Sequence, residues 1–323
     1  MSSVLILSHQ DVLAALPPDE CAEAMATVLA AHARGEALMP LRSMVPFDGA
    51  AGFMGLMPAW RGGEDPVFSL KSLCVMPGNP ARGLDSHQGT VTLFDGAIGV
   101  PKAILDASAV TAVRTAAVSA VATRVLSRED ATVLAILGAG VQGKAHLDSL
   151  LPVRQFEEVR MFAPNRSHAE ETAGDRAAVA ASAEEAVRGA DVVVLATTAR
   201  EPVLQRDWLA PGTHVNAVGA SVPSARELDV DTVASSALFC DSRESLRNEA
   251  GEFLVALRER AIPGEEHVRG ELGEVLAGMA PGRLSADELT VFRSLGLAVE
   301  DLAAAECAVV RARRMGIGKG VAL

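Results

Sequence analysis

Three glycines near the middle of the chain have the spacing of a dinucleotide-binding loop. Gly138, Gly140 and Gly143 form a GxGxxG pattern in TVLAILGAGVQGKAHL. The apolar run at 133–137 predicts a buried strand, and a helical pattern follows directly. The first glycine permits a tight turn, the second lets a pyrophosphate approach the backbone, and the third lets helix and strand pack closely. In this strand–turn–helix setting the pattern predicts a phosphate site at the helix N-terminus.

Two cations stand alone in apolar segments. Lys71 is the only charged residue in VFSLKSLCVM, and Arg114 is the only one in SAVTAVRTAAVSAVA. Burying an unpartnered charge is costly, so each residue either forms a structural ion pair or faces a cavity and holds a carboxylate. We favour the second interpretation, in which removing such an uncompensated cation costs the fold little stability. Arg42, in PLRSMVP, is a third candidate cation for the same carboxylate.

His87, in LDSHQGT, is a candidate for proton transfer near neutral pH. The alternative is a hydrogen-bonded turn residue. The histidines and cysteines show no metal-ligand spacing, so no metal site is expected. GxSxG and Walker patterns are absent as well, which argues against the usual hydrolase and P-loop chemistries.

The second strand of the nucleotide-binding pattern indicates which cofactor is used. An acidic residue at the end of that strand binds the ribose of NAD, whereas an arginine accommodates the 2′-phosphate of NADP. Here VRMF is followed by Ala163, Pro164, Asn165, Arg166 and Ser167, with no acid. We therefore expect NADPH, with NADH as the alternative. A solvent-exposed Arg166 without this role is the other interpretation.

The elements that would position these residues fall into three parts. Residues 1 to about 107 combine a helix at 19–34 with β-like runs at 41–46, 52–58, 67–76 and 89–106, the last a hairpin. An apolar helix at 108–126 would join two domains. Strands at 132–137, 158–162, 176–180, 191–196, 213–218 and 237–240 then alternate with helices, the rhythm of a doubly wound parallel sheet. After residue 240 the pattern is mostly helical and closes with a helix at 296–314.

Composition limits the classes of partner. The 323 residues suffice for two domains, and 41 acidic against 29 basic residues give a net charge of −12. This balance argues against nucleic acid and anionic membranes as partners. Four scattered cysteines indicate a reduced, cytoplasmic protein. Neither a signal peptide nor an apolar run of about 18 residues is recognised in the sequence.

Taken together, the motifs resemble the ornithine cyclodeaminase/mu-crystallin family over essentially the whole chain. They are PLRSMVP, LKSLCVMPGNP, LDSHQGTVTLFD, AVRTAAVSAVAT, LGAGVQGKAHL, NAVGAS, RELD and VFRSLGLAVED. The resemblance implies an α/β protein that forms a homodimer through a β-sheet. It implies a smaller α+β domain for substrate binding and dimerisation, at 1–115 with 297–323. A Rossmann NAD(P)-binding domain would occupy 116–296.

The resemblance also implies the site residues. Arg42, Lys71 and Arg114 would hold the substrate carboxylate, with His87 and Ser221 as further catalytic residues. The resemblance adds Thr115, Val218 and Gly219 as cofactor contacts. With the glycine loop and the residues after the second strand, the predicted cofactor-binding residues are Thr115, Gly138, Gly140, Val141, Gln142, Gly143, Asn165, Arg166, Ser167, Thr197, Val218 and Gly219.

Ser221 separates the activities within the family. Ornithine cyclodeaminases and archaeal alanine dehydrogenases carry Asp where this chain has Ser221 in NAVGAS, and the segment is more similar to the mu-crystallin type. We therefore expect NAD(P)H-dependent reduction of Δ1-pyrroline-2-carboxylate or Δ1-piperideine-2-carboxylate to proline or pipecolate, a small anionic imino acid being the substrate. Lys71, His87 or water would supply the proton. Ornithine cyclodeamination and non-catalytic binding of a small molecule are the alternatives.

Overall fold

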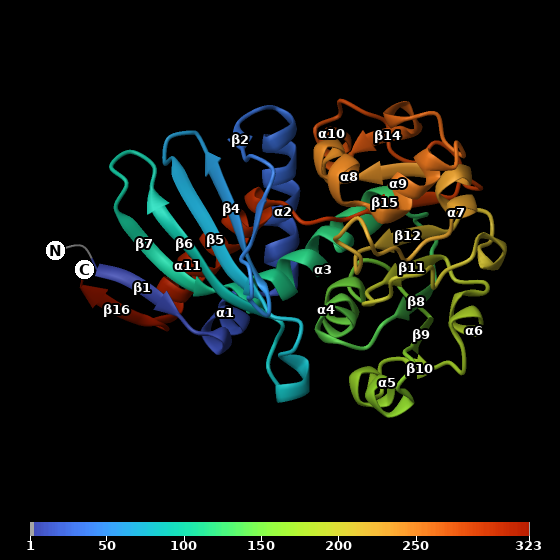
Figure 1. Cartoon of the computed structure of the whole chain (residues 1–323), viewed down its shortest axis with the longest axis horizontal. Coiled ribbons are helices and arrows are strands. Elements are labelled where there is room, and N and C mark those ends of the chain that lie inside the picture. Colours follow the sequence, from blue (N-terminus) through green and yellow to red (C-terminus); the bar gives the residue numbers. More distant parts are fainter. Residues whose placement is uncertain (1–2, 323) are drawn as a thin grey trace. The chain divides into compact units, whose positions relative to one another are not determined.

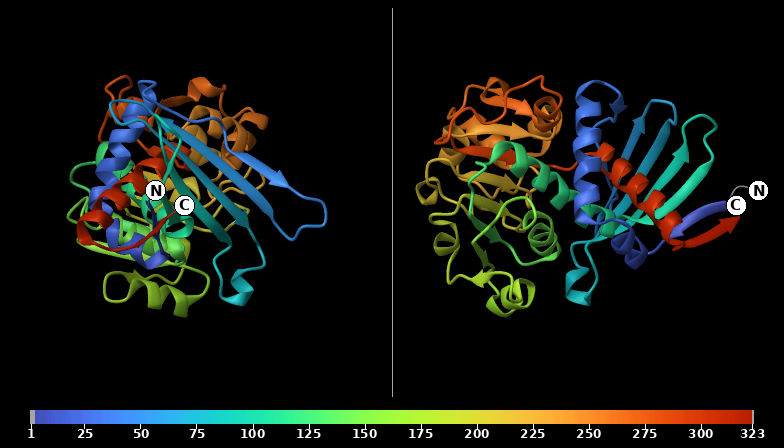
Figure 2. Two further views of the ribbon diagram at one scale, coloured as in Figure 1. Left: turned by 90° about the vertical axis from the view of Figure 1, so that its left-hand side faces the viewer. Right: turned by 180° about the vertical axis from the view of Figure 1, so that it is seen from behind.

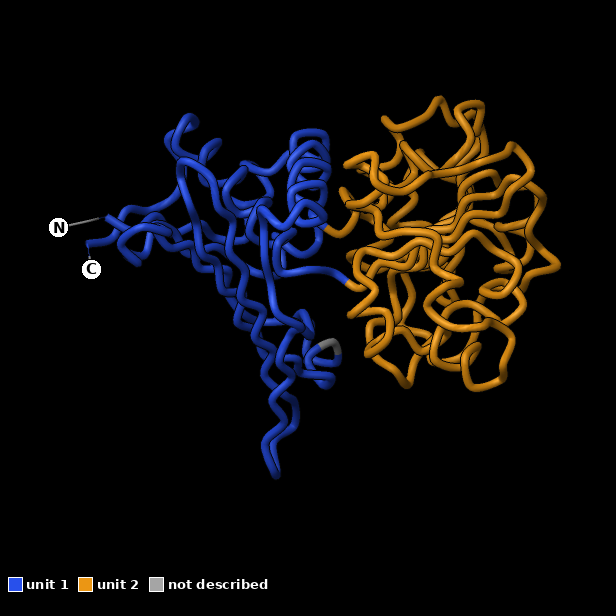
Figure 3. The backbone as a smooth tube through the Cα atoms, turned by 90° about the horizontal axis from the view of Figure 1, so that it is seen from above, with its two compact units in different colours: residues 1–114, 296–323 blue, residues 115–295 orange. Residues whose placement is uncertain are grey.

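The chain forms two compact units in a computed structural model that describes residues 3–322. Unit 1 comprises Met1–Arg114 with Gly296–Leu323, and unit 2 comprises Thr115–Leu295 (Figure 3). These boundaries lie one residue from the domain limits expected from the sequence. The apolar helix α3 (Ala107–Leu126) contains the boundary, in the position where the sequence predicts a joining helix.

Unit 1 is built on an eight-stranded sheet in the order β16-β1-β7-β6-β5-β4-β2, with β3 pairing with β4. Its strands are β1 (Ser3–Leu7), β2 (Ala37–Leu38), β3 (Ser43–Pro46), β4 (Phe53–Arg61), β5 (Val67–Val75), β6 (His87–Asp95), β7 (Pro101–Asp106) and β16 (Lys319–Ala322). The expected hairpin is present as β6 and β7. Strands β1 and β16, which pair antiparallel with each other, were not predicted.

Helices cover one face of this sheet. They are α1 (His9–Ala15), α2 (Pro18–Ala33) and α11 (Ala298–Met315). Helix α11 lies against β4, β5 and β6 and packs beside α2 (Figures 1 and 2). Alternate residues of β5, namely Ser69, Lys71 and Leu73, are buried under this layer.

The opposite face of the sheet is apolar and partly exposed. Trp60, Phe68 and Phe94 stand in one row across β4, β5 and β6, because Phe68 pairs with both of the others. Phe68 remains 46% exposed. Aromatic residues are only 3% of the chain, so a row of three is a local concentration of apolar surface.

Unit 2 contains the doubly wound parallel sheet that the sequence predicts. Its order is β10-β9-β8-β11-β12-β15-β13-β14, and every pair is parallel. The strands are β8 (Val133–Leu137), β9 (Glu158–Phe162), β10 (Ala178–Val179), β11 (Val192–Leu195), β12 (His214–Ala217), β13 (Ala237–Cys240), β14 (Val268–Glu271) and β15 (Thr290–Arg293). The chain order reverses at β8, which has β9 on one side and β11 on the other. Ligands of such sheets bind at this switch point.

The segment after residue 240 contains more helix than strand, as expected, but the expectation missed β14 and β15, which belong to the sheet. Strand β15 lies between β12 and β13. All four of its residues are buried, but its sequence TVFR holds two apolar residues and ends in Arg293, so no apolar run marks it as a strand. The helices of this unit are α4 (Val141–Leu150), α5 (Arg166–Ala173), α6 (Ala183–Val187), α7 (Val230–Ser235), α8 (Arg243–Glu249), α9 (Gly251–Arg258) and α10 (Leu272–Leu276).

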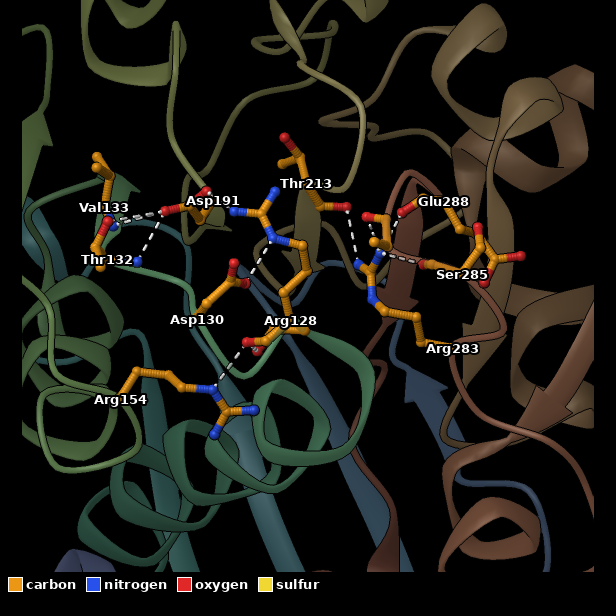
Figure 4. A network of polar contacts seen from close by, with 12 residues as sticks. Arg128, Asp130, Thr132, Val133, Arg154, Asp191, Thr213, Arg283, Ser285 and Glu288 are labelled. Carbon is orange, nitrogen blue, oxygen red and sulfur yellow. Dashed lines mark hydrogen bonds and ion pairs between the residues drawn. The ribbon is translucent and has the colours of Figure 1, made fainter.

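Helix α3 is long and apolar enough to cross a membrane, contrary to the expectation that no such segment exists. However, 78% of its apolar window is buried inside the protein, as in a core helix. Its C-terminal carbonyls are bound by cations: Arg154 donates to Arg124 O at 3.0 Å, and Arg283 donates to Leu126 O at 2.7 Å. Figure 4 shows both arginines in this network. Positive charge interacts favourably with the negative C-terminal end of the helix dipole. The two arginines also bind carbonyl groups that have no partner within the helix.

Candidate functional site

The glycine loop between β8 and α4 has room for a phosphate. Gly138 has φ +113°, and a Cβ there would lie 2.3 Å from Ala196 O. A Cβ on Gly143 would lie 2.1 Å from Gly138 O, so this glycine permits the close packing of helix and strand. A Cβ on Gly140 would meet nothing within 4 Å. Gly140 is also the N-cap of α4 and offers no side-chain cap. The N–H groups of the first turn therefore face open space that suits a pyrophosphate.

The other predicted residues of the loop and of the following strand lie at the same edge of the sheet. Val141 is exposed and Gln142 half-buried at the start of α4. Asn165 caps α5, and its side chain accepts from His168 N–H at 3.2 Å. Arg166 and Ser167 are exposed in the first turn of α5. Arg166 Nε donates to Glu170 Oε1 at 2.9 Å, so a 2′-phosphate bound there would compete with this carboxylate.

Thr197, Val218 and Gly219 occupy the loops that follow β11 and β12. Val218 N–H donates to Leu195 O at 3.0 Å. Thr197 and Gly219 both donate to the carboxylate of Glu227, a residue to which the sequence motif RELD assigned no role. Ser221 is exposed two residues beyond Gly219, and Thr115 is buried on α3.

In unit 1, Lys71 and Arg114 meet at one carboxylate. Lys71 Nζ donates to Asp301 Oδ1 and Oδ2 at 3.1 and 3.0 Å. Arg114 Nε donates to Asp301 Oδ1 at 3.0 Å, and its Nη1 donates to Glu300 Oε2 at 2.9 Å. Lys71 and Arg114 are only 3% and 5% exposed. Lys71 on β5 and Arg114 on α3 are thus linked through the acidic residues in the first turn of α11.

The expectation that these cations are uncompensated is therefore wrong. Asp301 and Glu300 neutralise them, and neither acid was recognised as a site residue. The signal was present in GLAVEDLAAA, where two adjacent acids interrupt an apolar helix just as Lys71 and Arg114 interrupt their own segments. Buried charges of opposite sign in apolar segments are expected to pair.

Arg42 and His87 lie close to Lys71. The charge of Arg42 affects the pKa of Lys71, and the charge of Lys71 affects the pKa of His87. Burial lowers the pKa of the Lys71 ammonium to about 8; Asp301 opposes the shift, and Arg114 and Arg42 add to it. Desolvation also lowers the pKa of His87, against the effect of Asp85, and the charges of Lys71 and Arg42 lower it further. The His87 side chain is 54% exposed, and Ser86 Oγ lies 3.0 Å from its Nδ1. Unit 1 thus gathers Arg42, Lys71, His87 and Arg114 into one neighbourhood.

Comparison with known proteins identifies the family. The sequence profile of the ornithine cyclodeaminase/mu-crystallin family matches residues 3–315. The chain belongs to this family. Ketimine reductase mu-crystallin of Mus musculus is 42% identical over 276 residues, which cover 84% of each chain.

Solved structures of ornithine cyclodeaminase/mu-crystallin relatives share the fold along the whole chain. Δ1-Pyrroline-2-carboxylate reductase of Thermococcus litoralis, in complex with NADH and L-proline, superposes with a TM-score of 0.92. It is 35% identical, and the match covers 98% of this chain and 100% of that one. An archaeal alanine dehydrogenase dimer with bound NAD has the same TM-score at 32% identity, with 99% of each chain covered.

This family member also has a cavity at the amino ends of β8, β12 and β15, lined by 127–130 and 283–287. Its two arginines already bind protein acceptors. Arg128 pairs with Asp130 and Asp191 at 2.9 and 2.8 Å, and Arg283 donates to backbone carbonyls and to Thr290 Oγ1 (Figure 4). The cofactor loop lies at the carboxyl end of the sheet, so this cavity is not the candidate active site.

Proposed function

We propose that the protein is an NAD(P)H-dependent reductase that converts a cyclic ketimine carboxylate to an L-amino acid. The substrate is Δ1-pyrroline-2-carboxylate or Δ1-piperideine-2-carboxylate, and the product is proline or pipecolate. The observation that carries this proposal is one chain holding both an open glycine loop and a buried cation cluster. The family, with relatives named ketimine reductase and Δ1-pyrroline-2-carboxylate reductase, supports it.

The cation cluster binds and orients the substrate. Arg42 matches a planar carboxylate with two parallel donors, and Lys71 adds a point charge. Arg114, whose Nε and Nη1 bind Asp301 and Glu300, adds positive charge beside them. When bound at the glycine loop, NAD(P)H supplies the hydride that reduces the C=N carbon. Holding the carboxylate fixes that carbon, and orientation of this kind can supply much of the rate.

Lys71 donates the proton that the ring nitrogen takes up. With a pKa of about 8 it is mostly protonated at pH 7 yet gives up its proton more readily than an ordinary lysine. His87, whose pKa lies below its usual value, is mostly neutral there. Hydride and proton together turn the imine into a secondary amine, and solvent then reprotonates Lys71. We expect kcat/KM for imine reduction to fall as the pH rises through about 8.

Two glycine variants test the cofactor site directly. In Gly140→Ala the added methyl meets no protein atom, so thermal stability is retained while the phosphate space is filled, and NADPH binding weakens at least about tenfold. In Gly143→Ala the methyl collides with Gly138 O, so stability falls as well. The assay is NADPH oxidation with Δ1-pyrroline-2-carboxylate and detection of proline. Wild-type affinity in Gly140→Ala would contradict the site.

Ornithine cyclodeamination is the second candidate, and Ser221 argues against it. That reaction needs an amine oriented and deprotonated, and the neutral serine hydroxyl is a poor base at pH 7. A cyclic imine has no free amine to position. We predict efficient imine reduction, ornithine turnover that is far weaker, and little effect of Ser221→Ala on the reductase. Ammonia and proline release from ornithine with NAD is the measurement. Efficient release would overturn the reductase proposal, and binding without any turnover would favour the non-catalytic alternative.

The proposed setting is a cytoplasmic homodimer that prefers NADPH. The four cysteines form no disulfide in the described structure, which suits a reducing compartment. The row of Trp60, Phe68 and Phe94 on the open sheet face supports an interface with a second copy. Arg166 at the end of β9 supports the NADPH preference.

A further inference from the structure

One buried carboxylate joins the two loops at the carboxyl ends of β11 and β12. Glu227 is fully buried. Its Oε1 accepts from the Thr197 N–H at 2.8 Å and from the Thr197 hydroxyl at 2.7 Å. Its Oε2 accepts from the N–H groups of Gly219 and Ala220 at 2.6 and 3.3 Å. Both oxygens of one side chain are therefore used to fix the backbone of two separate segments.

The segment that carries Glu227 is itself held in place. The N–H groups of Val203 and Leu204 donate to Glu227 O at 2.9 and 3.1 Å. Leu204 and Leu228 also form a parallel β-bridge. The carboxylate is thus presented from a fixed backbone rather than from a free loop end.

The loops that carry Thr197 and Gly219 approach each other so closely that there is no room for a side chain on Gly219. A Cβ on Gly219 would lie 2.1 Å from Thr197 O and 2.6 Å from Glu227 Oε1. Without the carboxylate, the N–H groups of Thr197, Gly219 and Ala220 would lose a shared acceptor. Leaving a buried donor unpaired costs more than a typical hydrogen bond contributes, so the loops would rearrange.

The position of these loops indicates which part of the cofactor they serve. The pyrophosphate belongs at the Gly138–Gly143 loop after β8, and the adenosine ribose belongs on the β9 side, near Asn165 and Arg166. Strands β11 and β12 lie on the other side of β8. The nicotinamide half of the cofactor therefore extends over the ends of β11 and β12, where Thr197, Val218 and Gly219 are found.

We infer that Glu227 is a positioning residue that holds these two loops in the geometry that binds the nicotinamide half of NAD(P)H. The inference rests on the proposed function, because it assumes that unit 2 binds this cofactor. Glu227 acts through the backbone of Thr197 and Gly219 and makes no contact with the reacting atoms itself.

The test compares Glu227→Gln with a matched control at the other edge of the same sheet. Asp191 Oδ2 accepts from the N–H groups of Thr132 and Val133 at 2.8 and 3.0 Å, so it fixes strand ends in the same way, far from the cofactor edge (Figure 4). In Glu227→Gln the amide nitrogen replaces one acceptor and faces backbone donors. Affinities for NADPH and for 2′-phospho-ADP-ribose, which lacks nicotinamide, are measured by calorimetry, with melting temperature alongside.

We expect Glu227→Gln to weaken NADPH binding about tenfold or more and to leave 2′-phospho-ADP-ribose binding within about twofold. Asp191→Asn should lower the melting temperature but leave both affinities within about twofold. Unchanged NADPH affinity in Glu227→Gln, or equal losses for both ligands, would overturn the inference. If that variant does not fold, Thr197→Val, which removes the hydroxyl that donates to Glu227 Oε1 and keeps the volume, decides in the same assay. A wild-type protein that binds neither of these ligands, nor NADH, would instead overturn the proposed function.

Discussion

Asp301 binds two cations, Lys71 and Arg114. Variants of Lys71 with and without Asp301 can therefore separate an effect on substrate binding from an effect on folding. Lys71→Met leaves one buried carboxylate with less compensation, and we expect the melting temperature to fall. We also expect kcat/KM for the cyclic imine to fall. The loss of transition-state stabilisation should be about 2–5 kcal/mol, the range for losing one partner of a desolvated charge pair.

The double variant Lys71→Met with Asp301→Asn supplies the control. It removes both charges of the pair, so it should regain part of the stability but none of the activity. Thermal denaturation and steady-state kinetics on all three proteins are the measurements. Activity that returns together with stability would show that Lys71 is only structural.

Arg166 has a matched control for cofactor choice within the same unit. Arg166 and Arg188 both form exposed i,i+4 pairs, with Glu170 and Glu184, but only Arg166 stands at the end of β9. Arg166→Ala should reduce the kcat/KM ratio of NADPH to NADH about tenfold to a hundredfold, because a charge-assisted contact with the 2′-phosphate is lost. Arg188→Ala should leave the ratio unchanged. An unchanged ratio in Arg166→Ala would remove the basis for an NADPH preference.

At the scale of elements, the sequence predicted those helices, strands and turns that a local residue pattern determines. The glycine loop, the β6–β7 hairpin and the parallel strands as far as β13 have periods or turn residues that can be read directly. Strand β15 was not predicted, because its sequence TVFR holds two apolar residues and no apolar run marks it; β11, β12 and β13 are equally buried and were predicted. The sequence shows that Asp301 is a charge in an apolar helix, but it does not identify its partners, since Arg114 lies 187 residues away. Only the fold decides which buried charges and donors meet.

Two buried histidines of unit 2 make the fold sensitive to acid. His146 on α4 contacts Ser119 Oγ at 2.9 Å, and His214 on β12 contacts Thr290 Oγ1 at 3.0 Å. Burial lowers the pKa of His146 to about 4 and that of His214 to about 3. The unfolded chain takes up these protons near pH 6.5 while the folded protein does not. Stability is therefore complete above this pH and is lost as the pH falls toward 4.

We predict that each ring costs about 2 kcal/mol of unfolding free energy at pH 5, since about 1.4 kcal/mol accompanies each unit below 6.5. Denaturant titrations between pH 7 and 5 measure this slope. The double variant His146→Gln with His214→Gln should have a flatter slope, whatever its stability at pH 7. The same slope in both proteins would contradict the assignment of acid sensitivity to these rings.

At the scale of the whole molecule, the open sheet face of unit 1 predicts the assembly. Phe68, between Trp60 and Phe94 in the aromatic row, should be buried against a second copy. Phe68→Glu should shift the mass measured by light scattering from twice 33.5 kDa to a single chain. Met279→Glu, which changes an exposed apolar residue of unit 2, should remain dimeric. A wild-type monomer would exclude this role for the face.

The division of unit 1 between two stretches of sequence has a consequence for biosynthesis. Residues 115–295 leave the ribosome as one block that contains every strand of their own sheet, so this unit can fold as soon as β15 has emerged. Unit 1 begins at β1 but lacks α11 until translation has passed residue 315. We therefore expect the nascent chain to complete unit 2 first. Lys71 on β5 and Arg114 on α3 remain without their acidic partners until the helix that carries Asp301 is made.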